Sequence, residues 1–160
     1  MSKGYYLLVN IISMQKIISS IVFIFLVLVS CSSEKREPHY NIKGHQSQVI
    51  VDMIEAVNQK NAEKYVAEFA ENVRVLVGST LKVKGRNELK ENRAKHFKAY
   101  PNLRSEIQYL IEIDNKVIMH DKVWLNSSEE RGRDIVEIFV FEDGKVMEVD
   151  VIQSKDFFNK

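Results

Sequence analysis

The spacing of apolar side chains predicts helices and one strand in the first part of the region that begins at residue 46. Over residues 47–59, apolar positions recur every three or four residues with charged positions opposite, which predicts an amphipathic helix. The polar stretch 58–61 interrupts this spacing, and residues 62–69 resume it as a second, short helix. Valines alternate with other residues over 73–78, which predicts a strand that ends at Gly78.

A third helix is expected between Asn87 and Pro101. Asn87 can cap the first turn through its side chain, and a proline cannot continue a helix. One face of this helix carries Leu89, Arg93, His96, Phe97 and Tyr100.

After Pro101 the apolar positions alternate, which predicts strands over 107–113, 117–125, 135–141 and 146–152. Asp143-Gly144 is typical of a tight hairpin turn. Helices followed by an antiparallel meander predict an α+β domain, with three N-terminal helices covering one face of a curved antiparallel sheet. The expected core includes Ile54, Phe69, Phe97, Tyr109, Ile111 and Phe139, with Ile107, Tyr109, Ile111 and Ile113 on one apolar face.

The N-terminal region has a different pattern, that of an export signal. Lys16 precedes an apolar run that ends at Ser30-Cys31 and is too short to span a bilayer comfortably. The segment Leu28-Val29-Ser30-Cys31 resembles the lipobox of bacterial lipoproteins, which implies cleavage before Cys31 and lipidation of that cysteine. The alternative is an uncleaved signal anchor that ends at Cys31.

We therefore divide the chain into a signal peptide (1–30), a lipidated cysteine with a flexible polar tether (31–45) and one domain (46–160). Residues 1–13 are expected to come from an upstream start codon, since Met14 begins a more ordinary signal peptide. The expected location is the bacterial cell envelope, periplasmic or surface-exposed, with a lipid anchor in the membrane. The chain has 23 Lys and Arg against 22 Asp and Glu, without a basic cluster, so no nucleic-acid partner is expected.

Several short motifs, in their order and spacing, resemble the SnoaL-like branch of the nuclear transport factor 2-like, or ketosteroid-isomerase-like, superfamily. They include the polar break before Ala62-Glu63, Lys84-Gly85-Arg86, Tyr100-Pro101-Asn102-Leu103 and the terminal hairpin with Asp143-Gly144. The resemblance covers residues 47–153. It implies a cone-shaped sheet around a mostly apolar pocket, commonly in a homodimer packed through the sheet.

Catalytic members of this superfamily use a pocket Asp to move a proton, often with His, Tyr or Arg nearby. Asp121 is the best candidate, because it interrupts an apolar alternation and a desolvated carboxylate is a stronger base. His120 lies on the opposite face of the same predicted strand, and the pattern leaves open which face lines the pocket.

Three further residues are weaker candidates. Glu137 also lies on an apolar strand face, where a carboxylate is either functional or a paired structural group. His96 lies on the apolar face of the third helix, where a core or rim role is the alternative. Asp150 occupies the place of a catalytic Asp in some SnoaL-like cyclases, but the segment is one residue shorter, which reverses the side-chain direction.

Two functions remain open from the sequence. In the first, the pocket binds a small apolar molecule or an envelope protein without catalysis. In the second, the domain is a cofactor-free acid–base enzyme, an isomerase, dehydratase or hydrolase, acting on a small apolar substrate. No cofactor or metal site is expected, since the four histidines lack ligand spacing.

Overall fold

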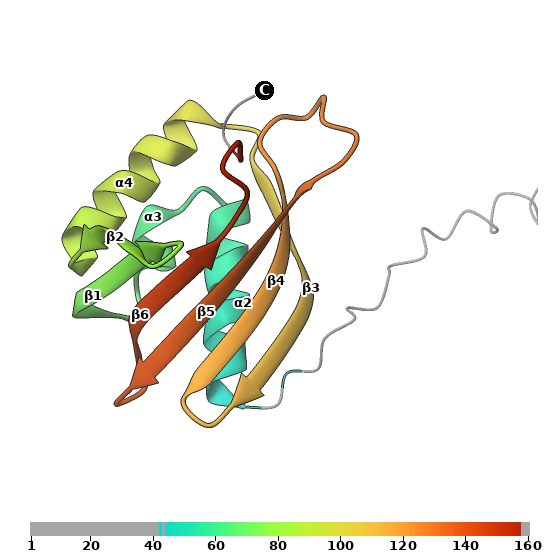
Figure 1. Cartoon of the computed structure of the whole chain (residues 1–160). Coiled ribbons are helices and arrows are strands. Elements are labelled where there is room, and N and C mark those ends of the chain that lie inside the picture. Colours follow the sequence, from blue (N-terminus) through green and yellow to red (C-terminus); the bar gives the residue numbers. More distant parts are fainter. Residues whose placement is uncertain (1–41, 43, 158–160) are drawn as a thin grey trace, which may run out of the picture. The chain divides into compact units, whose positions relative to one another are not determined.

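Helices come first and most strands follow, as the apolar pattern predicts (Figure 1). The computed structural model describes residue 42 and residues 44–157; the predictions on the signal peptide, on Cys31 and on most of the tether lie outside these residues. The elements are α2 (His45–Asn58), α3 (Ala62–Tyr65), β1 (Phe69–Val77), β2 (Thr80–Lys84), α4 (Arg86–Ala99), β3 (Arg104–Ile113), β4 (Lys116–Trp124), β5 (Arg133–Glu142) and β6 (Lys145–Ile152).

Six strands form one curved, open sheet in the order β2-β1-β6-β5-β4-β3. The predicted meander from β3 to β6 is confirmed, with antiparallel pairing throughout. The sheet is nevertheless mixed, because β1 pairs with β6 in parallel. Strand β2, which the sequence analysis does not predict, adds an antiparallel edge to β1. The α+β class is correct, and the purely antiparallel sheet is corrected at this one pairing.

The helices lie on the concave face of the sheet and enclose the core there. Helix α2 contacts β3 and β4, whereas α4 contacts β1 and β2. Four of the predicted core residues are buried, namely Ile54, Phe69, Phe97 and Phe139. Phe139 and Met119 are fully buried at the centre of this layer. Burial of a phenylalanine side chain stabilises a core by about 1.5–3 kcal/mol relative to exposure.

The prediction that Tyr109 and Ile111 belong to the core is wrong. Ile107 pairs with Asp121, but Tyr109 pairs with His120, so Gln108 is an extra residue in β3. Such a β-bulge reverses the direction of every side chain that follows it on the strand. Tyr109 and Ile111 are therefore 60% and 51% exposed on the outer face of the sheet.

The N-cap of α4 is Gly85 and not Asn87, which lies inside the helix. Gly85 has φ 102°, a conformation that favours glycine. Its N–H donates to the carbonyl of Val73 at 2.7 Å, and its carbonyl accepts from Leu89 N–H at 3.1 Å. The preceding helix is also shorter than predicted, because Phe69 already begins β1. Among residues 42 and 44–157, none of the helices is both long and apolar enough to cross a membrane.

Candidate functional site

A cavity of about 330 Å³ lies between the concave face of the sheet, α4 and the segment that follows β6. Its volume falls at the lower end of the range for small-molecule sites. Most of its wall is apolar, with contributions from Val57, Val75, Val83, Leu89, Leu125 and Ile135. Polar residues also line it, and each one is a candidate for contact with a ligand: Lys82, Asn92, Arg93, His96, Ser105, Asp121, Glu137 and Gln153.

Asp121 lies in this cavity, because the alternation of β4 turns it to the same face as Met119 and Val123. Only 2% of its surface is exposed. Its Oδ1 accepts a hydrogen bond from Glu106 N–H at 2.9 Å, and its Oδ2 accepts one from the Ser105 hydroxyl. Burial raises the pKa of Asp121 to about 6, although these hydrogen bonds favour the charged form.

Glu137 enters the same cavity from β5. It pairs with Met119, so it lies one diagonal step from Asp121 on the same face of the sheet. Burial raises the pKa of Glu137 to about 7; the positive charge of Arg93 opposes this rise, and the negative charge of Asp121 adds to it. Two carboxyls thus share one cavity, and both titrate nearer to neutrality than exposed carboxyls do.

Helix α4 supplies Arg93 and His96 to the cavity wall. The guanidinium of Arg93 lies 4.6 Å from the ring centroid of Tyr65, which is buried beside it. Burial, together with the charge of Arg93, lowers the pKa of His96 to about 4. His96 is therefore neutral at physiological pH. One of its ring nitrogens can donate a hydrogen bond and the other can accept one.

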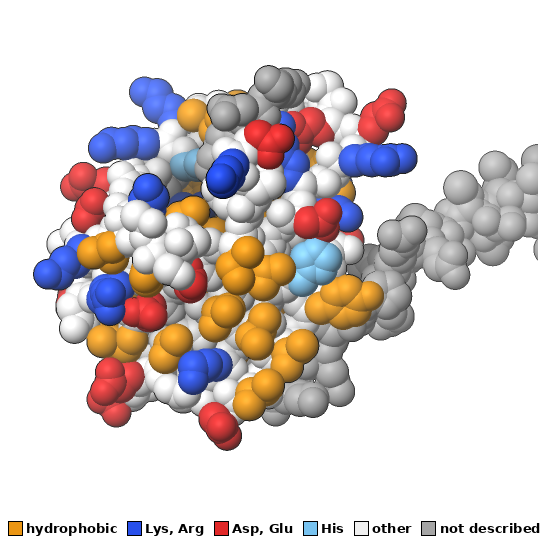
Figure 2. All heavy atoms as spheres, viewed as in Figure 1, with side chains coloured by type: hydrophobic (Ala, Val, Ile, Leu, Met, Phe, Trp, Pro, Cys, Tyr) orange, Lys and Arg blue, Asp and Glu red, His pale blue; other side chains and the backbone are white. Residues whose placement is uncertain are grey.

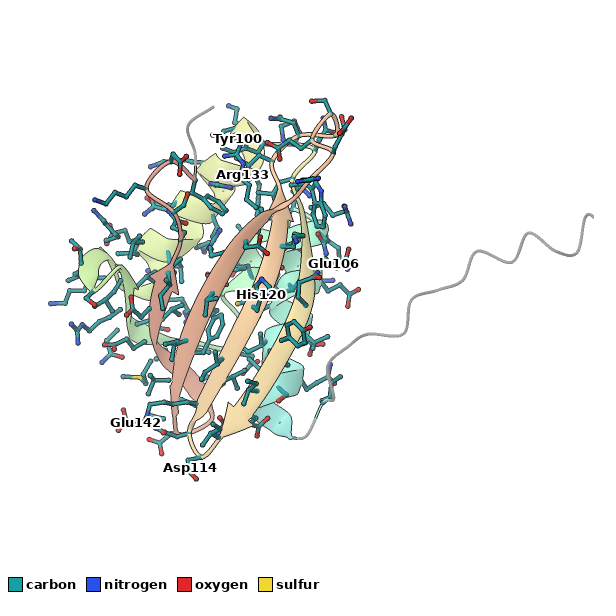
Figure 3. The ribbon with its side chains drawn as sticks, turned by 45° about the vertical axis from the view of Figure 1, so that its right-hand side comes forward. Tyr100, Glu106, Asp114, His120, Arg133 and Glu142 are labelled. Carbon is teal, nitrogen blue, oxygen red and sulfur yellow. The ribbon has the colours of Figure 1, made fainter. Side chains whose placement is uncertain are left out.

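His120 lies outside this site, on the outer face of the sheet (Figure 3). Its Nε2 is 2.8 Å from Oδ1 of Asp134, and its ring stacks on Tyr109 with 5.9 Å between centroids. The structure thus settles which face of β4 lines the pocket: it is the face of Asp121. Asp150 does not line the cavity either; it accepts a hydrogen bond from Ser79 N–H at 3.3 Å, in the β1–β2 turn.

Arg93 and Ser105 are cavity residues that the sequence pattern does not identify as site residues. A signal for Arg93 exists, since a charged residue at a core position of a helix is uncommon. Ser105 has a weaker signal, because it precedes Ile107 by two residues and shares its inward face, where it is 5% exposed.

The site contains acid–base groups but no recognisable metal set. Within the described part of the chain, no group of three or more His, Cys, Asp and Glu side chains has the proximity needed to hold a metal ion. The arrangement can hold a polar group of a small molecule against two carboxyls and one guanidinium, while the rest of that molecule contacts apolar wall.

The SnoaL-like domain model matches residues 50–149, which include every strand from β1 to β5 and most of β6. The chain belongs to the SnoaL-like domain family. A search of curated proteins found no match.

Solved structures agree with this SnoaL-like assignment at the level of the fold. An NTF2-like protein of unknown function from Cytophaga hutchinsonii has 12% sequence identity and a TM-score of 0.59, covering 75% of this chain and 98% of its own. A putative ketosteroid isomerase from Kribbella flavida has 17% identity and a TM-score of 0.58, with 69% and 78% coverage. TerC, co-crystallised with polyporic acid, has 16% identity and a TM-score of 0.59, with 72% and 95% coverage. Identities this low establish the NTF2-like fold alone.

Proposed function

We propose that this SnoaL-like domain binds a small, mostly apolar molecule in the cavity, with an oxygen function of that molecule beside Glu137 and Asp121. One observation carries the proposal: an apolar cavity of about 330 Å³ encloses two buried carboxyls from adjacent strands. Buried polar groups in a core cost free energy unless they are satisfied, so proteins keep them mainly where they have a use.

The similar proteins support a small molecule as the occupant. TerC was crystallised with polyporic acid, and the Kribbella flavida protein is a putative ketosteroid isomerase. The N-terminal sequence supports the cell envelope as the place where this pocket works, through a lipid at Cys31.

The binding experiment uses the neutral ketone 2-acetonaphthone as a probe and follows the methyl NMR signals of the cavity wall. Its matched variants are Ile135→Trp, which places a larger side chain in the cavity, and Val136→Trp, which faces outward from the next position of β5. We expect the parent and Val136→Trp to bind, and Ile135→Trp to lose binding. Equal binding by both variants would place the probe elsewhere and reject the proposed pocket.

Acid–base catalysis in the same pocket is a second candidate. It is favoured by the pKa values of Asp121 and Glu137, about 6 and about 7, because a catalytic acid or base works best near the ambient pH. A panel of enones, epoxides and hydroxy-ketones tests it with Asp121→Asn and Glu137→Gln. Turnover by the parent that both variants lose would establish catalysis, whereas turnover that both retain would remove these carboxyls from the mechanism.

A further inference from the structure

The side chain of Asn58, the last residue of helix α2, is hydrogen-bonded to the start of β3. Its Nδ2 donates to the carbonyl of Ser105 at 2.9 Å, and its Oδ1 accepts from Ser105 N–H at 2.9 Å. The amide thus binds both backbone groups of a single residue, as a neighbouring strand would. Because β3 is an edge strand of the sheet, these groups have no other strand on that side.

The residue held in this way is the one that contacts Asp121. The Ser105 hydroxyl donates to Oδ2 of Asp121, and the next backbone N–H, that of Glu106, donates to Oδ1 at 2.9 Å. The two donors, the Ser105 hydroxyl and the Glu106 N–H, therefore belong to consecutive residues. The position of both depends on the backbone of Ser105, which the Asn58 side chain binds. Lys60 adds a second tie at the same junction, since its Nζ donates to the carbonyls of Asn58 and Leu103.

We propose that Asn58 is a positioning residue for Asp121, acting through Ser105 and the Glu106 amide. Asn58 is itself an exposed residue and does not line the cavity, so it acts on the carboxyl and not on a ligand. The proposal rests on the proposed function in taking Asp121 as a working group of the pocket.

The consequence is a change in the acidity of Asp121 when Asn58 is lost. Hydrogen bonds to a carboxylate favour its charged form, so misplacing the two donors raises the pKa. The other charged or titratable groups at this site are Glu137 on β5, Arg93 and His96 on α4, Lys82 on β2 and His120 on β4 itself. The side-chain hydrogen bonds at Asn58 go to Ser105 and Lys60 and to none of these groups.

The test is a ¹³C NMR titration of the Asp121 carboxyl in ligand-free protein, with Asn58→Ala, Ser105→Ala and the control Asn115→Ala. Asn115 is a matched control, because it is also exposed and its Nδ2 also donates to a backbone carbonyl, that of Phe141 at 3.1 Å. It lies in the β3–β4 turn, away from Ser105. We expect Asn58→Ala and Ser105→Ala each to raise the pKa of Asp121 by about half a unit to one unit, and Asn115→Ala to leave it unchanged.

The proposal is overturned if Asn58→Ala leaves the pKa of Asp121 at the parent value, or if Asn115→Ala raises it equally. Should Asn58→Ala not fold, Asn58→Ser replaces it, with a side chain too short to reach both backbone groups. Failure of the binding experiment above would not change this outcome, since the titration needs no ligand.

Discussion

Asp121 and Glu137 project into one cavity from adjacent strands, and the charge of Asp121 adds to burial in raising the pKa of Glu137 to about 7. Strand register produces this pairing, because Glu137 lies opposite Met119, two residues from Asp121. A change at one carboxyl is therefore expected to alter the other, as in other coupled pairs.

Glu137→Gln is expected to change how stability depends on pH. The folded-state pKa of Glu137 is raised from 4.5 to about 7, so the folded protein holds this proton to higher pH than the unfolded chain does. The free energy of unfolding of the parent consequently falls as pH rises through that window. Relative to the parent, the variant should gain up to about 3 kcal/mol between pH 4.5 and pH 8. Urea unfolding at several pH values measures this gain, with Glu142→Gln on the exposed end of β5 as control; the same pH dependence in both variants would contradict it.

Arg133 is expected to hold one wall of the cavity in place. Its guanidinium donates to the carbonyl of Phe157 and pairs with Glu129 at 2.8 Å, and Glu129 accepts from Leu125 N–H at 2.8 Å. Phe157 and Leu125 both line the cavity, and Figure 3 shows Arg133 at the end of the sheet where Tyr100 also lies. We expect Arg133→Gln to lower the free energy of unfolding by about 1–3 kcal/mol, because it leaves buried partners unsatisfied.

The control for this prediction is Arg131→Gln, an exposed arginine in the loop that precedes β5. Thermal melts of both variants and their affinity for 2-acetonaphthone are the measurements. Equal melting temperatures for the two variants would show that Arg133 does not brace this wall.

The outer face of the sheet is expected to form a homodimer interface, which we propose from its exposed apolar side chains. Tyr109, Ile111, Ile113 and Ile152 are between 51% and 60% exposed, and Figure 2 shows apolar side chains across this face. Exposed apolar side chains gathered on one face of a protein typically mark an interaction site. Ile111→Glu should yield a monomer in sedimentation velocity, whereas Leu81→Glu, an exposed apolar position on β2, should not. A parent protein that sediments as a monomer at high concentration would contradict the prediction.

Cys31 is expected to carry a lipid and to hold the mature protein in the membrane fraction. The reason is the signal-like run that ends at Leu28-Val29-Ser30-Cys31, in a chain with a single cysteine. Mass spectrometry of the mature N-terminus measures the modification, and Cys31→Ala should release the protein into the soluble fraction. An unmodified Cys31, or a retained segment 16–30, would contradict it.

The alternation of apolar residues was enough to predict the meander and the burial of Phe139, and the Asp143-Gly144 dipeptide was enough to predict the hairpin between β5 and β6. It failed at Gln108, because a bulge leaves the sequence period intact while it reverses the side-chain direction after it. The two-residue repeat of apolar positions therefore predicted, wrongly, that Tyr109 and Ile111 are in the core.

Site residues could be predicted where the pattern of a single strand points to them. Contacts between side chains of different helices and strands could not be predicted. Asp121 and Glu137 could be named, since a lone carboxylate in an apolar alternation is conspicuous. His120 was a candidate because the strand pattern alone does not show whether His120 or Asp121 faces the pocket. Only the packing of the sheet shows that Asp121 faces inward. The Asn58–Ser105–Asp121 connection joins three elements, and no local pattern encodes it.

The most direct test of the account is a ¹³C NMR titration of the Asp121 and Glu137 carboxyls, without and with 2-acetonaphthone. We expect inflections near pH 6 and pH 7 in the free protein. Bound ligand should raise the Glu137 value further, because an apolar occupant excludes water from the carboxyls. Ordinary values near 4 for both carboxyls, with no response to the ligand, would contradict the proposal that this cavity is a binding site built around them.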